Sequence, residues 1–215
     1  MNKLVFFDLD GTISRHDTLL PYIFSYALRR PWRLPRFILV LPAVLQYALG
    51  VYDHGLLKQA LLRRVLGGAS RASLRAHTVR WITSCVQHGC FRDALEAIAA
   101  HKAAGDTLIL MSASVDLYVP ALAAALGFSD SICTSTQWHG DQYDGKLTST
   151  NIRDQEKARQ VGARMQGAAQ SSVAYGNSAP DLPHLRLVDK GYLINGNRKL
   201  TAAAEDAGIH CLRWR

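Results

Sequence analysis

Asp8 and Asp10 directly follow a short apolar run, residues 4–7, near the start of the chain. A run of this kind, without polar alternation, predicts a strand that is buried on both faces, as in a parallel sheet. Side chains two residues apart on an extended chain point the same way, so both carboxylates are expected beyond the carboxyl end of this strand. Open α/β sheets bind their ligands at that end. The alternative is a solvated turn, closed by Gly11, with no chemical role.

Further apolar runs predict the rest of a parallel sheet. They occupy residues 107–111 and 172–175, with weaker candidates around Val188 and at residues 209–212. Strands that alternate with helices imply parallel pairing through right-handed crossovers, so the predicted fold class is α/β with a Rossmann-like core. The helical patterns between the strands occupy residues 91–104, 115–126, 154–166 and 198–207.

Asp144 and Gly145 stand between strand-like flanks in residues 136–148. This dipeptide is typical of a tight turn, and the stretch predicts a small β-hairpin.

Residues 15–90 interrupt the alternation of strands and helices, because they carry helical patterns and no convincing strand. This layout predicts an all-helical cap inserted into the α/β core. The expected domains are therefore a core of residues 1–14 and 91–215 and a cap of residues 15–90.

One stretch of the predicted cap is both apolar and basic. Between Thr18 and Tyr52 there is no Asp or Glu. The apolar run 37–45 is too short to span a bilayer, which takes about 20 residues, and Pro42 is expected to kink it. The stretch is either a buried cap helix with solvated arginines or, at residues 29–52, an interfacial element that contacts a membrane peripherally. Its basic residues are Arg29, Arg30, Arg33 and Arg36.

The composition excludes a disordered chain, because 48% of the 215 residues are apolar and 20% are charged. The net charge of +8 favours anionic partners, which include phosphorylated metabolites, nucleic acid and acidic membranes. Nucleic acid is not expected, since no recognition motif is present and the arginines are interleaved with aliphatic residues.

The four cysteines form no CxxC pair and no His/Cys cluster with zinc spacing. We expect them to be reduced thiols. The start of the chain fits no signal peptide, so we expect a cytoplasmic protein, peripheral at the inner face of the membrane if the interfacial element forms.

Other positions supply groups that phosphoryl transfer needs. Ser112 follows the second apolar run, and Lys157 lies near the start of a predicted helix. Asn177 and Asp181 follow the third predicted strand. With the paired carboxylates, they would provide a nucleophile, a phosphate-binding hydroxyl, a lysine and a metal-binding pair. Mg²⁺ fits this set, because it is a hard ion that takes carboxylate and carbonyl oxygens and keeps several waters.

In these motifs the chain resembles the haloacid dehalogenase-like (HAD) phosphatases, over nearly its whole length and with all four motifs in order. The resemblance implies a Mg²⁺-dependent phosphomonoester hydrolase. It makes Asp8 the nucleophile, which forms an aspartyl phosphate, and Asp10 the general acid and base. The implied metal ligands are Asp8, the backbone carbonyl of Asp10, Asn177 and, through a water, Asp181; the implied phosphate ligands are Thr12, Ser112, Ala113 and Lys157.

The resemblance leaves the substrate open between small and amphiphilic phosphomonoesters. Asp17 and Arg64 fall where phosphoserine phosphatases bind the amino and carboxyl groups of their substrate. The arginine-rich apolar stretch is instead similar to the cap of bacterial phosphatidylglycerophosphate phosphatases, which act on a lipid phosphate at the membrane. Arg153 and Asn151 precede the lysine helix and could reach the mouth of the site. A weakly catalytic, phosphate-binding regulatory protein is a further alternative.

Asn177 departs from the resemblance, because the fourth motif usually has Asp at this position. The amide oxygen can still ligate Mg²⁺, but one negative charge is lost. We expect Asn177→Asp to bind Mg²⁺ more tightly than the wild type, with activity present in both. A magnesium titration of phosphatase activity measures this, and identical half-saturation would contradict it.

Overall fold

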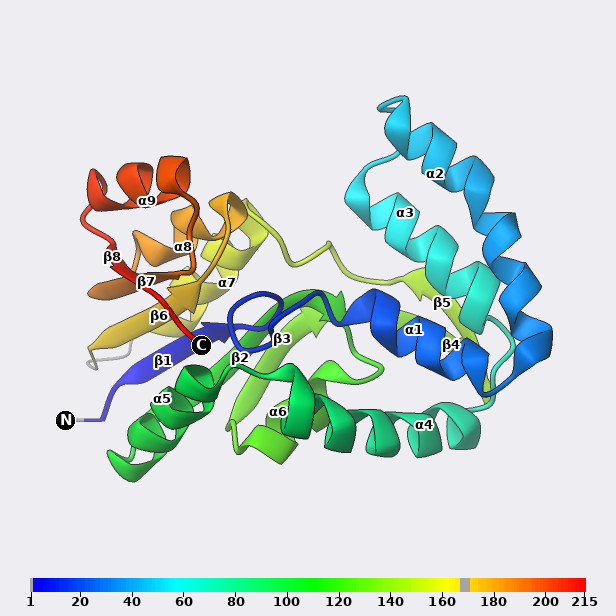
Figure 1. The fold of residues 1–215 in the computed structure, drawn as a ribbon, viewed down its shortest axis with the longest axis horizontal. Coiled ribbons are helices and arrows are strands. Elements are labelled where there is room, and N and C mark those ends of the chain that lie inside the picture. Colours follow the sequence, from blue (N-terminus) through cyan, green and yellow to red (C-terminus); the bar gives the residue numbers. More distant parts are fainter. Residues whose placement is uncertain (1, 167–170) are drawn as a thin grey trace.

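In residues 2–166 and 171–215, which the computed structural model describes, six parallel strands form one sheet in the order β3-β2-β1-β6-β7-β8 (Figure 1). The first strand lies in the middle, and the chain then builds the sheet outward on one side and afterwards on the other. The winding direction therefore reverses between β1 and β6, which is where open α/β sheets bind ligands. The strands are β1 (Leu4–Asp8), β2 (Thr107–Val115), β3 (Asp130–Thr134), β6 (Ser172–Gly176), β7 (Lys190–Ile194) and β8 (His210–Leu212).

The central strands are buried on both faces. In β1, Val5 and Phe7 belong to one hydrophobic cluster, whereas Leu4 and Phe6 belong to the other. Successive side chains of a strand point to opposite faces, so an unbroken apolar run serves two cores at once. Helices cover both faces in Figure 1. They are α5 (Arg92–Ala103) and α6 (Val119–Leu126) on one side, and α7 (Gln155–Met165), α8 (Leu182–Leu185) and α9 (Arg198–Glu205) on the other.

The structure confirms the α/β fold class and corrects some boundaries. Strand β3 was not predicted, because its sequence is polar and its exposure alternates. The residues predicted as a strand around Val188 precede β7, and residues 115–118 precede α6 instead of beginning it. Ser112 lies inside β2, at an irregularity in the pairing with β3, and not after the strand.

The predicted hairpin is present as β4 (Thr136–His139) and β5 (Gln142–Leu147), but its turn is elsewhere. His139 pairs with Gln142, so Gly140 and Asp141 form the turn. Asp144 and Gly145 lie within β5. Gly145 is needed there for a tertiary reason, since a methyl group on it would lie 2.9 Å from the backbone nitrogen of Arg63.

The segment between β1 and α5 is helical. Its two ends meet, because the backbone N–H of Arg15 donates to Gly89 and that of Phe91 donates to Ile13. One hydrophobic cluster continues from the sheet into this segment, so the division into core and cap stays a prediction. The segment contains α1 (Leu19–Leu28), a 3-10 helix (Pro31–Val40), α2 (Leu41–Ala48), α3 (His54–Leu61), a π-helical turn (Leu62–Leu66), α4 (Arg71–Ser84) and a second π-helical turn (Cys85–Gly89).

The apolar, basic stretch is not one helix. The 3-10 helix ends at Val40, and Pro42 occupies the first turn of α2, where a proline costs no backbone hydrogen bond. None of the described helices is long and apolar enough to cross a bilayer.

The arginines of this stretch differ in exposure. Arg29 is exposed, whereas Arg33 is buried and donates from Nη1 to the carbonyls of Val65, at 2.7 Å, and Gly67, at 3.2 Å. The expectation that all four arginines are solvated or lie on headgroups is therefore wrong for Arg33. This side chain joins the 3-10 helix to the end of the first π-helical turn.

We expect Arg33→Ala to lower the free energy of unfolding by about 2 kcal/mol, because the buried carbonyl of Val65 loses a charged donor, whereas that of Gly67 keeps Arg36. Arg29→Ala removes the same group from an exposed position and should change it by less than about 0.5 kcal/mol. Urea unfolding of the two variants beside the wild type measures both, and equal effects would contradict the structural role of Arg33.

Candidate active site

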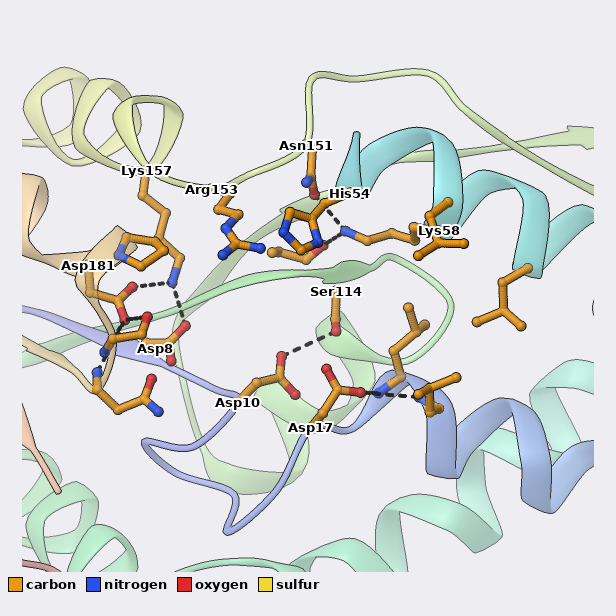
Figure 2. A pocket seen from close by; sticks show the side chains of 18 of the residues that line it. Asp8, Asp10, Asp17, His54, Lys58, Ser114, Asn151, Arg153, Lys157 and Asp181 are labelled. Atoms are coloured by element: carbon orange, nitrogen blue, oxygen red, sulfur yellow. Dashed lines mark hydrogen bonds and ion pairs between the residues drawn. The ribbon is translucent and has the colours of Figure 1, made fainter. Parts of the chain in front are cut away.

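A cavity of about 520 Å³ lies beyond the carboxyl ends of β1, β2 and β6 (Figure 2). It is therefore at the point where the winding direction of the sheet reverses. One part of its wall is polar and carries charges of both signs. The polar lining residues are Asp8, Asp10, Asp17, His54, Lys58, Ser114, Asn151, Arg153, Lys157, Asn177, Ser178 and Asp181.

Lys157 joins two carboxylates at one side of the cavity. From the first turn of α7, its Nζ donates to Asp8 Oδ1 at 2.5 Å and to Asp181 Oδ1 at 2.7 Å. All three residues are buried. The other oxygen of Asp181 accepts from Ser178 Oγ at 2.6 Å and from the backbone N–H groups of Ser178 and Asn177. The short helical turn after β6 therefore holds Asp181 in place against the lysine.

These contacts shift the pKa values of Asp8 and Asp181 in opposite directions. Burial, together with the nearby charges of Asp181 and Asp10, raises the pKa of Asp8 to about 7 against the attraction of Lys157. Burial also opposes ionisation of Asp181, but the Lys157 ammonium and the bonds from Ser178 outweigh it and lower the pKa of Asp181 to about 2. Burial lowers the pKa of Lys157, yet the two carboxylates hold it above its ordinary value.

Asp10 has a different environment, made of hydroxyl groups. Its Oδ1 accepts from the Thr18 backbone N–H at 2.7 Å and from Thr18 Oγ1 at 2.5 Å. Its Oδ2 accepts from Ser112 Oγ at 3.0 Å and Ser114 Oγ at 3.2 Å. Burial raises the pKa of Asp10, and the hydrogen bonds from Thr18 only partly offset this effect. A raised pKa suits a general acid, because such a group has to hold a proton before it can donate it.

Gly11 allows the turn after β1 to approach the turn after β6. A methyl group on Gly11 would lie 2.1 Å from Asn177 Nδ2, and the residue has a φ of +85°. Both the space and the backbone conformation therefore require glycine. Thr12 is buried behind the site, and its Oγ1 donates to Asp8 Oδ2 at 2.9 Å. Its hydroxyl thus orients Asp8 and does not line the cavity.

The residues present fit the Mg²⁺ ion that the resemblance implies. The buried carboxyl groups of Asp8 and Asp181 share the single ammonium of Lys157, and the half-buried Asp10 beside them has no cation in hydrogen-bond contact in the described structure. The Asn177 side chain makes no hydrogen bond to any described residue, so its oxygen is available. Among residues 2–166 and 171–215, no three His, Cys, Asp or Glu side chains form a metal cluster. The ion would therefore need the Asn177 amide and the Asp10 backbone carbonyl in addition to carboxylates.

The structure brings most of the predicted site residues together. Ala113 and Arg153 line the cavity, and Figure 2 shows the Arg153 side chain directed into it. Asp17 also lines the cavity, but its Oδ1 accepts from the backbone N–H groups of Leu19 and Leu20 and so stabilises the start of α1. Ser112 is fully buried and reaches the site only through Asp10.

Arg64 is the exception. It is exposed and is not among the described residues that line the cavity. The reason is local, because the chain forms a π-helical turn at Leu62–Leu66, which rotates the side chains relative to a regular helix.

Lys58, six residues earlier, supplies a cation that sequence reasoning missed. Its Nζ donates to Asn151 Oδ1 at 2.5 Å and to the carbonyl of Ala113 (Figure 2). Burial lowers the pKa of Lys58 to about 8, and the carboxylates of Asp10 and Asp17 limit the fall. The sequence around Lys58 has a helical pattern, but it does not show which face of that helix lies against Asn151.

The remaining wall of the cavity is apolar. It comes from the helical segment, which contributes Leu19 and Leu20 of α1, Val40, Val44 of α2, and Leu57 and Leu61 of α3. The cavity therefore combines a charged end at the sheet with an apolar wall from the helices.

Comparisons with known proteins agree with this architecture. The sequence profile of the haloacid dehalogenase-like hydrolases matches residues 5–186. Protein CicA of Caulobacter vibrioides is 28% identical over 200 residues, which cover 89% of this chain and 86% of CicA. A probable phosphatase of Mycobacterium tuberculosis is 26% identical over 209 residues, covering 94% of this chain and 72% of that one.

Two solved structures share the fold. A Bordetella pertussis protein of unknown function superimposes with a TM-score of 0.79 at 21% identity, over 99% of this chain and 98% of its own. A probable phosphoserine phosphatase from Vibrio cholerae has a TM-score of 0.74 at 16% identity, over 99% of this chain and 61% of its own. The profile covers all the residues that form the charged end of the cavity. The chain therefore belongs to the haloacid dehalogenase-like hydrolases.

Proposed function

We propose that this hydrolase is a Mg²⁺-dependent phosphomonoesterase that acts through an aspartyl phosphate on Asp8. The observation that carries the proposal is the contrast between two carboxyl groups at the end of β1. Asp8 contacts the Lys157 ammonium, whereas Asp10 is surrounded by hydroxyl donors, and both line one cavity. Two carboxyl groups in such different environments suit two different roles.

In the first step, the Asp8 carboxylate attacks phosphorus and the bond between phosphorus and the leaving oxygen breaks. Asp10 donates its proton to that oxygen, so the leaving group departs as an alcohol. The raised pKa of Asp10 supports this role, because a protonated acid is required at neutral pH. The bonds from Thr18, Ser112 and Ser114 hold the Asp10 carboxyl group in a single orientation.

In the second step, Asp10 is ionised and takes a proton from a water molecule, whose oxygen attacks phosphorus. The bond between phosphorus and Asp8 breaks, which releases inorganic phosphate and restores the Asp8 carboxylate. Lys157 remains paired with Asp181 throughout, so its charge offsets negative charge on the transferring phosphoryl group. Bound Mg²⁺, held by Asp8, Asn177 and the Asp10 carbonyl, would add further positive charge at the phosphoryl oxygens.

The cavity favours an amphiphilic phosphomonoester as the substrate. Its apolar wall would be without a partner beside a small polar metabolite. Phosphoserine is the alternative. It would need a cation for its carboxylate, and Lys58 is better placed for this than Arg64. A panel of phosphoserine, glycerol phosphate and lysophospholipid phosphates separates these substrates.

We expect Asp8→Asn to abolish release of phosphate from p-nitrophenyl phosphate, and Asp10→Asn to reduce it by about 10³-fold or more. Asp141→Asn makes the same change at an exposed position and should leave the rate unchanged. A colorimetric assay with Mg²⁺ measures all three. Turnover by Asp8→Asn would end the proposal, and absence of turnover in the wild type on any substrate would favour a phosphate-binding regulator.

Stability should depend on pH through Asp8. Folding raises the pKa of Asp8 from 3.8 to about 7, so between these values the metal-free folded state holds a proton that the unfolded chain has released, and its stability falls as the pH rises across this range. Mg²⁺ needs the ionised form, so its apparent affinity should be roughly 30-fold weaker at pH 5.5 than at pH 8. Thermal shift titrations with MgCl₂ at the two pH values measure this.

The Asp8→Asn variant provides the control, because other groups, among them His77 and His184, also titrate with lowered pKa values. The difference between wild type and Asp8→Asn isolates the contribution of Asp8. A Mg²⁺ effect that is independent of pH in the wild type would contradict the raised pKa.

A further inference from the structure

Exposed apolar side chains are concentrated in one part of the chain. Of fifteen large apolar residues that are exposed in the described structure, twelve lie between Leu20 and Leu56. The other three are Val79, Leu187 and Leu212, which are far apart in the sequence. Single exposed apolar residues are ordinary on a soluble protein, but a concentration of this kind marks an interaction surface.

The exposed residues form stripes along the helices. Leu20, Phe24 and Leu28 follow each other at a spacing of four on α1 and are 50–55% exposed. Leu41 and Leu45 of α2 continue the pattern with 60% and 61% exposure. Side chains four apart lie on one side of a helix, so each helix presents an apolar stripe outward. In Figure 1, α2 and α3 extend away from the sheet. We call the twelve residues the apolar face.

The apolar face overlaps a basic stretch without acids, which ends before the exposed Asp53. Residues 18–52 contain four arginines and no acid, and they contribute half of the net charge of +8. No ion pair in the described structure involves these arginines. Arg33 and Arg36 donate to the carbonyl of Gly67, and Arg30 donates to Ser73 Oγ. Their partners are neutral, so their positive charge stays uncompensated beside the apolar face.

The apolar face continues into the cavity. Leu20 is 55% exposed and Val44 is 45% exposed, yet both line the cavity that contains Asp8 and Asp10. Leu20 and Val44 therefore join the apolar face to the apolar wall of the cavity. The charged end of the cavity would then receive the head group of a lipid bound there.

From these observations we propose that the apolar face is a docking surface for an anionic lipid bilayer, which presents a lipid phosphomonoester to the cavity. The substrate part rests on the proposed function; the docking part does not. Binding would be peripheral, with leucines of α1 and α2 in the acyl boundary and with Arg29, Arg30 and Arg36, which are not buried, attracted to anionic headgroups. A protein partner is the weaker interpretation, because it would need acidic groups placed opposite these separate arginines, whereas an anionic bilayer presents negative charge all around an inserted apolar face.

The test uses the whole chain and two matched double variants. Leu41→Glu/Leu45→Glu changes two leucines of the apolar face that do not line the cavity. Val79→Glu/Leu187→Glu adds the same charge at positions that are 62% and 49% exposed on other elements. Each protein is sedimented with vesicles of phosphatidylcholine alone and with vesicles that also contain phosphatidylglycerol. Melting temperature and hydrolysis of p-nitrophenyl phosphate show whether each variant is folded.

We expect the wild type and the control variant to bind the anionic vesicles, more weakly at high salt and on phosphatidylcholine alone. The Leu41→Glu/Leu45→Glu variant should bind at least about tenfold more weakly. It should lose hydrolysis of lysophosphatidic acid in vesicles and keep that of p-nitrophenyl phosphate. The Asp8→Asn variant should bind vesicles and hydrolyse neither substrate, so a failure of the proposed chemistry is distinguishable from a failure of docking.

Equal vesicle binding by the two double variants, or no binding by the wild type, would overturn the proposal. So would sedimentation equilibrium that shows a dimer of this chain, lost in Leu41→Glu/Leu45→Glu, in a protein that does not bind vesicles. The apolar face would then be an interface between two copies.

Discussion

The arrangement of the site depends on one buried ion-pair cluster, in which the Lys157 ammonium lies between the carboxyl groups of Asp8 and Asp181. Lys157 and Asp8 are 149 positions apart in the chain. Buried carboxylates repel each other and lose their hydration, so they are tolerated at the end of a sheet only with a cation or a proton between them. The parallel pairing of β1 with β6, the turn after β6 and the first turn of α7 all serve to place these three groups.

The same cluster explains why the carboxyl groups of Asp8 and Asp181 differ in pKa. Asp181 accepts hydrogen bonds from Ser178 in addition to Lys157, and its pKa is lowered. Asp8 lacks the bonds from Ser178, so burial raises its pKa. Asp10 is turned toward Thr18, Ser112 and Ser114 and has no cation in hydrogen-bond contact in the described structure. The helical segment adds the other half of the site. Arg33 and Arg36 bind backbone carbonyls of this segment, and Leu20, Leu41 and Leu45 remain exposed. Leu20 also lines the cavity.

Several local expectations failed where a contact between distant segments decided the outcome. Lys58 faces the cavity because α3 packs beside Asn151, and Arg64 turns away because a π-helical turn follows α3. Gly145 was interpreted as a turn residue, but it is in a strand that packs closely against Arg63. Strand β3 is polar and lies at the sheet edge, so it lacks the apolar run that identified the central strands. In each case the sequence pattern describes one short segment, whereas the structure depends on how that segment packs against others.

The sequence by itself determined the α/β class, the central strands and the positions of Asp8, Asp10, Lys157 and Asp181 at strand or helix ends. It could do so because strands buried on both faces must be continuously apolar, and because the carboxyl ends of parallel strands share one edge. Only the tertiary structure decided that Thr12 and Ser112 support the two aspartates from behind, that Lys58 enters the cavity, and that most leucines of α1 and α2 stay exposed. Those outcomes depend on which faces of separate helices meet, and helical periodicity identifies a face without naming its partner.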